Sequence, residues 1–190
     1  MNKMKLARGK NIKYFLLLLV ALLFSCSGTT KDESPEIDIF DGSYNDLNFS
    51  IGDFININFK INKEYDISEL PDAIEAYYGF WGSSDYERRE YELRFYPSNK
   101  IAKSSGTFFA EEASGEDAII KKADATWKEG IKDRRFVGPF GTSRNRPKYL
   151  DYVIFGNVIV LCPSEVSEKV IGAWDPIVNC KNMLSKLLNN

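Results

Sequence analysis

Two strongly apolar runs separated by Gly156-Asn157 constrain the fold of this 190-residue chain more than any other feature. Residues 152–155 and 158–161 are rich in β-branched and aromatic side chains, and Gly-Asn between such runs is typical of a two-residue hairpin turn. Neither run alternates with polar residues, a pattern typical of strands covered on both faces. The sequence therefore predicts a β-hairpin in the centre of a sheet.

Alternation with a period of two predicts two further strands, over residues 55–62 and 89–96. In the first, the inward face is expected to carry Ile55, Ile57, Phe59 and Ile61. In the second, the apolar residues Tyr91, Leu93 and Phe95 are expected to face the core, while Glu90, Glu92 and Arg94 face solvent.

Helical spacing and capping residues predict four helices. Apolar residues three and four positions apart favour a helix over residues 70–78. Ser98 and Ser114 are suitable caps for a second and a third helix, which extend to about residues 113 and 130. Ser164 is a suitable cap for the last helical segment, and Asp175-Pro176 resembles a fresh cap followed by a first-turn proline, so a broken or kinked helix is expected there.

From Arg89 onward the predicted order is strand, helix, helix, strand, strand, helix. With one helix treated as an insertion, this order matches part of a ferredoxin-like two-layer sandwich. We therefore expect one α+β domain over residues 47–190, with a mainly antiparallel sheet, a central Gly-Asn hairpin and helices packed on one face.

The N-terminus has the pattern of an export signal. Five basic residues precede position 14, and residues 14–24 carry no charge, a run too short to span a bilayer as a stable helix. The end of this run, with Leu23, Ser25 and Cys26, resembles the lipobox of bacterial lipoproteins. That resemblance implies cleavage before Cys26, at the end of a signal peptide over residues 1–25, and a diacylglycerol on the Cys26 sulfur. The alternative is an ordinary cleaved signal with Cys26 as a free thiol.

An anchored chain needs a spacer, and the polar residues 26–46 are suited to a flexible tether. The expected location is the bacterial cell envelope, lipid-anchored on the extracytoplasmic side of a membrane. In an oxidising compartment, Cys162 and Cys180 are expected to form a disulfide, and the alternative is two buried thiols. Cys180 lies on the predicted inner face of the last helix, towards the strand that ends at Cys162.

Composition excludes several kinds of chemistry. The chain contains no histidine, which excludes Ser-His-Asp triads, Cys-His pairs and most zinc sites. No cofactor or metal site is expected. The first 25 residues hold five of the 25 basic residues and none of the 27 acidic ones, so the remainder has 20 basic and 27 acidic side chains, a net charge of −7. An acidic chain of this kind argues against nucleic acid as a partner.

Against this acidic background, residues 128–148 carry seven basic side chains and two acidic ones. Arginine forks in a glycine-containing loop are suited to phosphate, sulfate or carboxylate groups. The alternative is a solvated loop that pairs with the acidic stretch 64–92. The candidate anion-binding residues are Arg134, Arg135, Arg144, Arg146 and Lys148.

Two other groups of side chains suggest weaker sites. One is aromatic and is suited either to stacking on sugars or to the core: Tyr77, Tyr78, Phe80, Trp81 and Tyr86. The other is acidic and is suited either to glycoside hydrolysis or to stabilising helix ends: Glu111, Glu112, Glu116 and Asp117.

Residues 86–91, 127–135 and 151–162 resemble segments of an uncharacterised bacterial lipoprotein family, over about residues 65–185. The resemblance implies no activity. Our prediction is a non-enzymatic lipoprotein, a binding or accessory domain whose partners are the membrane, through the anchor, and an anionic small ligand or an envelope protein. The alternatives are a cell-envelope hydrolase that uses carboxylates and a structural partner of an envelope complex.

Overall fold

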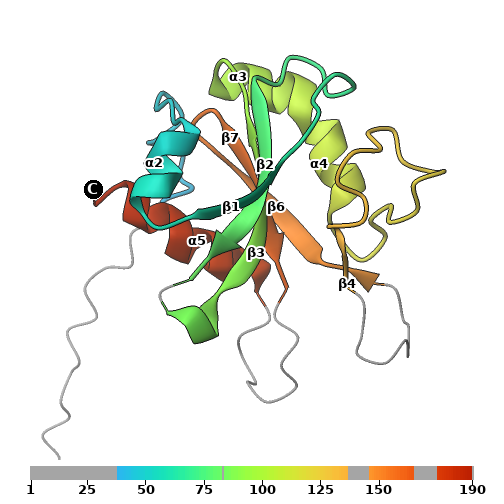
Figure 1. The fold of residues 1–190 in the computed structure, drawn as a ribbon. Helices are drawn as coiled ribbons and strands as arrows, with labels where there is room; N and C mark the ends of the chain where they lie inside the picture. The colour runs from blue at the N-terminus through green and yellow to red at the C-terminus, as the bar shows by residue number, and fades with distance from the viewer. Residues whose placement is uncertain (1–37, 83, 137–145, 165–174, 190) are drawn as a thin grey trace, which may run out of the picture. The chain divides into compact units, whose positions relative to one another are not determined.

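The computed structural model describes residues 38–82, 84–136, 146–164 and 175–189 (Figure 1). Its main feature is a five-stranded sheet of order β1-β2-β3-β7-β6, in which every neighbouring pair is antiparallel. The α+β class and the mainly antiparallel sheet are as predicted. The strands of this sheet are β1 (Lys60–Glu64), β2 (Glu75–Trp81), β3 (Arg89–Phe95), β6 (Tyr149–Phe155) and β7 (Val158–Pro163).

Shorter elements surround the sheet. β4 (Arg135–Phe136) and β5 (Arg146–Pro147) pair as a separate two-stranded ribbon. The helical segments are α2 (Ile51–Asn56), η2 (Asp85–Glu87), α3 (Asn99–Ile101), η3 (Ala102–Gly106, a π-helical turn), α4 (Thr107–Ala113) and α5 (Pro176–Leu187). None of the helices in the described ranges has the length and apolar character that a membrane crossing requires.

The Gly-Asn hairpin is confirmed, and β7 lies between β3 and β6 while β6 forms an edge. Gly156 has φ = 54°, a conformation that favours glycine in a two-residue turn. The buried Asn157 amide also joins distant segments. Its Nδ2 donates to the carbonyls of Phe49 (3.1 Å) and Tyr96 (2.9 Å), and its Oδ1 accepts from the Phe49 N–H at 2.6 Å. The turn therefore fixes the chain ahead of the first strand.

Helices cover both faces of the sheet, not one face as expected. On one face, α5 and α2 pack on Val158, Val160 and Phe95. On the other, the continuous helical run α3-η3-α4 packs on Ile159 and Leu161. Alternate residues of β7 point to opposite faces and all of them are apolar, so each face of this strand needs its own cover. This gives three layers in place of the predicted two-layer sandwich.

The predicted helix over residues 70–78 is wrong, because residues 70–74 form turns and irregular backbone and residues 75–78 belong to β2. Tyr77 and Trp81 pack in the core beneath α5, whereas Ala76 and Tyr78 pack on the opposite face against Trp127. A strand buried on both faces has no polar alternation, and its apolar residues then fit helical spacing equally well.

The predicted strand over residues 55–62 is interrupted by a turn. A capping box between Ser50 and Asp53 begins α2, and the chain reverses at Asn58, which has φ = 69°, before β1. Ile55 and Ile61 were expected in the core and are 49% and 43% exposed. The other two residues of the predicted inward face, Ile57 and Phe59, are buried.

The third predicted helix, residues 114–130, consists of turns. Its apolar residues are nevertheless used, because Trp127 is 1% exposed and packs edge-on against Tyr65 at a centroid distance of 5.7 Å. The Nε1 of Trp127 donates to the carbonyl of Asp66 at 3.1 Å. A segment without regular structure thus covers one end of the sheet.

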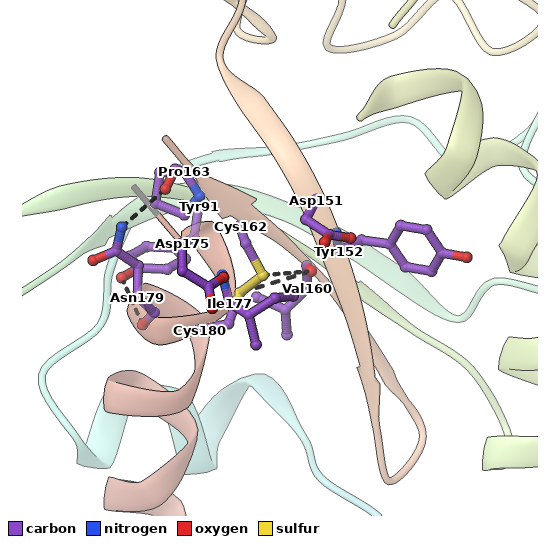
Figure 2. Close-up of a disulfide and its surroundings, with 10 residues drawn as sticks. All are labelled: Tyr91, Asp151, Tyr152, Val160, Cys162, Pro163, Asp175, Ile177, Asn179 and Cys180. Carbon is purple, nitrogen blue, oxygen red and sulfur yellow. Dashed lines mark hydrogen bonds between the residues drawn. A yellow bond between two sulfur atoms is a disulfide. The ribbon is translucent and has the colours of Figure 1, made fainter. Parts of the chain in front are cut away.

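The helix that begins at Ser98, the part of the last helix that follows Asp175 and the disulfide agree with the sequence, while residues 165–174 of the predicted last helical segment lie outside the described residues. The Ser98 hydroxyl accepts from the Ile101 N–H, and the Asp175 carboxylate accepts from the Ile177 N–H at 2.8 Å, so both predicted caps are present. Cys162 of β7 is bonded to Cys180 of α5, with a Cα–Cα distance of 5.5 Å (Figure 2).

Hydrogen bonds beside the disulfide also hold α5 on the sheet. Asn179 Nδ2 donates to the Pro163 carbonyl at 2.9 Å, and the Tyr91 hydroxyl donates to the Asn179 carbonyl at 3.1 Å (Figure 2). The first turns of α5 are therefore fixed to β7 and β3 by both covalent and polar contacts.

The folded part begins earlier than the predicted boundary at residue 47. Ile39 is 5% exposed and belongs to the main core. The rings of Phe40, Tyr44 and Phe49 all contact Phe155, with centroid distances of 6.3, 5.6 and 5.4 Å. Residues 38–46 are therefore packed on the domain and are not tether, because the outer strand β6 needs an apolar cover. Cys26 and the rest of the predicted tether lie outside the described residues.

Candidate functional site

A fully buried carboxylate lies at the centre of the sheet face beneath residues 114–134. Glu92 and Arg94 of β3 are both 0% exposed, which corrects the expectation that they face solvent. Glu92 Oε1 accepts from Arg94 Nε at 2.8 Å. The apolar alternation of β3 was interpreted correctly as a strand, but its charged face is buried because charged partners accompany it into the interior.

Arg134 supplies the second partner. Its Nε and Nη2 donate to the two carboxylate oxygens of Glu92 at 2.8 and 3.0 Å, a bidentate geometry that gives strong, directional pairs. The guanidiniums of Arg94 and Arg134 also lie over the Trp127 ring, 5.0 and 4.6 Å from its centroid. We call Glu92, Arg94, Arg134 and Trp127 the buried ionic cluster.

The electrostatics of this cluster favour ionised Glu92. Burial by itself would raise the pKa of Glu92, but the nearby positive charges of Arg134 and Arg94 outweigh that cost and hold the pKa below its ordinary value. For Arg134, burial acts to lower the pKa and the Glu92 carboxylate more than offsets it.

The buried ionic cluster contains two guanidiniums and one carboxylate, so it holds an excess positive charge. Among the described residues, Arg94 Nη1 has no hydrogen-bond partner, and neither do the buried hydroxyls of Tyr96 and Tyr149. An uncompensated charge in a region of low dielectric constant acts over a longer range than a solvated one. Neighbouring surface is therefore made more positive.

That neighbouring surface is a hollow of about 350 Å³. It lies between the end of β1 and the turns that precede β4, and five of its side chains are basic while two are acidic. We call it the basic hollow; its lining residues are Lys63, Ile120, Lys122, Lys128, Glu129, Gly130, Ile131, Lys132, Asp133 and Arg135.

Both acidic side chains of the basic hollow already have partners. Glu129 pairs with Lys63 at 2.6 Å, and the Asp133 carboxylate accepts from the Tyr65 hydroxyl at 2.9 Å. Four cations of the hollow form no ion pair within the part of the chain that the structure describes: Lys122, Lys128, Lys132 and Arg135.

Gly130 forms the wall between the basic hollow and the buried ionic cluster. It has φ = 72°, and a Cβ at this position would lie 2.9 Å from the Tyr65 ring and 3.1 Å from Arg134 Nη2. Only glycine suits this backbone conformation and this close approach. The buried guanidinium therefore lies directly behind the floor of the hollow.

The five candidate anion-binding residues are distributed differently from the prediction. Arg134 is 2% exposed and is committed to Glu92, and Lys148 pairs with Glu90 beside the Tyr78 ring. These two therefore follow the alternative interpretation, in which the basic segment pairs with the acidic stretch 64–92. Arg146 lies over the Phe136 ring at 4.8 Å, and Arg144 lies outside the described residues. Of the four candidates that the structure describes, only Arg135 lines the basic hollow.

The aromatic group is mostly core. Tyr77, Tyr78 and Trp81 are each 7% exposed, while Tyr86 is 97% exposed and separate from them on η2. Trp81 does line two further hollows at the other end of the sheet, but its Nε1 is already occupied by the Ile57 carbonyl at 2.9 Å.

The acidic group does not form a catalytic pair. The Glu112 carboxylate accepts from the Thr126 N–H at 3.0 Å, which is a structural role. Glu111 and Glu116 are exposed, and neither lines any of the hollows described above. Across the described ranges, no three carboxylate or cysteine side chains come together as metal ligands would.

A family model matches residues 50–188, which is most of the chain and nearly all of the described fold. The chain belongs to DUF6810, a family of unknown function. The match to DUF6810 spans the sheet, the buried ionic cluster and the basic hollow alike. No curated protein and no solved structure shows significant similarity to the chain.

Sequence reasoning missed Lys63, Lys122 and Gly130 as parts of one site. The charge count over residues 128–148 found the right region, but Lys63 is on an edge strand more than fifty residues earlier. The glycine directly after Lys128-Glu129 is the local sequence signal for a tight turn, and Gly130 has the left-handed conformation of such a turn, with φ = 72°.

Proposed function

We propose that this DUF6810 protein is a lipid-anchored, extracytoplasmic domain that binds an anionic ligand and catalyses no reaction. The observation that supports the binding role is the basic hollow, where four cations that form no ion pair with any described residue gather in a chain that is otherwise acidic. The anchor is supported by the lipobox-like Leu23, Ser25 and Cys26. The disulfide between Cys162 and Cys180 is consistent with an oxidising compartment.

A binding role is favoured over hydrolysis because the carboxylates available for acid–base work are exposed or have structural partners. The chain also lacks histidine, the usual general base. A structural role in an envelope complex is compatible with the same anchor and would use the same surface.

The anchor is tested in cells that carry the full chain or its Cys26→Ser variant. We expect the wild type in the membrane fraction, with an intact mass that includes the acyl groups and lacks residues 1–25. The variant should lose the acyl mass and leave the membrane, because anchoring depends on buried acyl chains at about 0.8 kcal/mol for each CH₂. Unprocessed, soluble wild-type protein inside the cell would contradict the proposal.

A further inference from the structure

We propose that the basic hollow is a site for a ligand with two or more oxyanion groups, of the phosphate or sulfate class. This inference rests on the proposed function for its biological setting, but the binding site stands on the geometry of the described residues. Three observations point to it: the arrangement of the cations, the size of the hollow and the buried charge behind its floor.

The cations belong to different parts of the lining, so they can contact an anion in the hollow from several sides. Lys128, Lys132 and Arg135 lie on one short segment, and Lys122 adds a fourth cation from the preceding turns. The three lysines are exposed and keep their ammonium groups in water, whereas Arg135 is half-buried. Its Nε is inaccessible to solvent and, among the described residues, has no hydrogen-bond partner. Because this Nε is enclosed, contact with an oxyanion in the hollow falls to Nη1 and Nη2 of the guanidinium, which can themselves form a fork.

The size of the hollow favours more than one oxyanion group. At about 350 Å³ it lies at the lower end of small-ligand sites and is larger than a single phosphate ion needs. Two apolar side chains, Ile120 and Ile131, contribute to the lining. The ligand therefore has room for a connecting group between its charges.

The positive charge behind the floor of the hollow adds a fixed contribution to the affinity for anions. Gly130 brings the backbone within contact distance of Arg134, and the buried ionic cluster carries one more positive charge than negative. Salt screens this charge less than it screens the exposed lysines. We therefore expect part of the anion affinity to persist when the ionic strength is raised.

The test is calorimetric titration of the full chain, extracted in a neutral detergent, with sodium tripolyphosphate as the probe. The double variant Lys128→Gln/Lys132→Gln removes two cations of the hollow. The matched control, Lys100→Gln/Lys103→Gln, removes two exposed cations near α3, far along the chain from the hollow. Circular dichroism of each variant verifies that it is folded.

We expect tripolyphosphate to bind the wild type and the control alike, and to bind the hollow variant at least about tenfold more weakly, since hydrogen bonds to charged groups are lost. Arg135→Lys should weaken binding and Arg135→Gln should weaken it further, because lysine keeps the charge and loses the fork. Inorganic orthophosphate should bind more weakly than tripolyphosphate in every folded variant.

Three results would overturn the proposal. The first is no heat of binding with tripolyphosphate. The second is an equal loss in the hollow variant and the control, which would mean that only net charge matters. The third is binding to phosphatidylglycerol vesicles without binding to tripolyphosphate, which would assign the basic hollow to a membrane surface. The two calorimetric results do not depend on acylation, so they are distinct from a failure of the anchor.

Discussion

Glu92 is a carboxylate with no exposed surface, and its two oxygens are held by guanidiniums from a neighbouring position of the same strand and from a distant loop. Removing one partner of such a cluster leaves the others charged and buried. We expect Glu92→Gln to lower the free energy of unfolding by about 3–5 kcal/mol, measured by urea denaturation.

Glu90 offers a matched control on the same strand. Its side chain is 38% exposed and it pairs with Lys148, so Glu90→Gln should cost no more than about 1 kcal/mol. Equal losses for the two variants would show that the buried ionic cluster contributes no more than a surface pair.

The same carboxylate predicts a loss of stability in acid. The guanidiniums hold the pKa of folded Glu92 below its ordinary value of 4.5, so the unfolded chain binds this proton first as the pH falls. The contribution of Glu92 is complete at pH 7 and is lost progressively below about pH 4.5, down to the pKa of the folded state. The free energy of unfolding, measured by urea denaturation at several pH values between pH 7 and the pKa of folded Glu92, should fall more steeply for the wild type than for Glu92→Gln.

Residues that are adjacent in the sequence have opposite roles here, and no local pattern separates them. Arg134 is buried against Glu92, whereas Arg135 lines the basic hollow. The charge run identified both as candidates for the same surface. What distinguishes them is a carboxylate 42 positions away, and sequence periodicity contains no information about a pair at that separation.

At the scale of elements, Gly106 shows how packing can reverse a propensity. Alanine usually stabilises a helix interior relative to glycine by up to about 1 kcal/mol. At Gly106 a Cβ would lie 2.5 Å from Ile159 and 2.6 Å from Tyr96. We therefore expect Gly106→Ala to destabilise the protein by about 1–3 kcal/mol, because the helical run must move away from the sheet.

Ser104 is exposed on the same helical turn and serves as the control. Ser104→Ala should change the midpoint of thermal unfolding only slightly, since surface substitutions usually alter stability by less than about 0.5 kcal/mol. A stabilised Gly106→Ala protein would show that the helical run has more room above β7 than the distances to Ile159 and Tyr96 imply.

The disulfide joins two elements that the sequence predicted separately. It closes a separation of 18 residues between β7 and α5, for which the chain-entropy model gives about 3 kcal/mol. Reduction with a phosphine should lower the midpoint of urea unfolding accordingly. The Cys162→Ala/Cys180→Ala protein should show the lower midpoint with or without reductant, and an unchanged wild type under reduction would contradict the prediction.

Helices and strands were predicted correctly where the signal comes from neighbouring residues. They were predicted poorly where burial on both faces removes the alternation of polar and apolar residues. The hairpin, the cap at Ser98 and the Asp175-Pro176 start depend on neighbouring residues, and all three are present. β2 was taken for a helix because it is covered on both faces. The turns of residues 114–130 have helix-compatible spacing, but their Trp127 is required at the buried ionic cluster.

For the molecule as a whole, the start of the folded unit is the main correction. A chain that begins at residue 38 keeps the contacts of Ile39, Phe40 and Tyr44 with the core, and a chain that begins at residue 47 loses them. Burying one large apolar side chain contributes about 1.5–3 kcal/mol. We expect the shorter chain to be less stable by a few times the lower of these values, measured by urea denaturation, and equal stability would restore the boundary at residue 47.

Composition and local pattern predicted the α+β class, the hairpin, two helix caps and the lack of any histidine-based site. The sequence also favoured a bond between Cys162 and Cys180, and the structure contains it. Tertiary structure alone decided which charges are buried and which surround the basic hollow. Burial of Glu92 becomes favourable only when Arg94 and Arg134 reach the same point, and that requires the completed sheet with residues 114–134 folded over it. The pattern of neighbouring residues determines whether a segment forms a helix or a strand. The environment of a charged side chain depends on all the segments that pack around it.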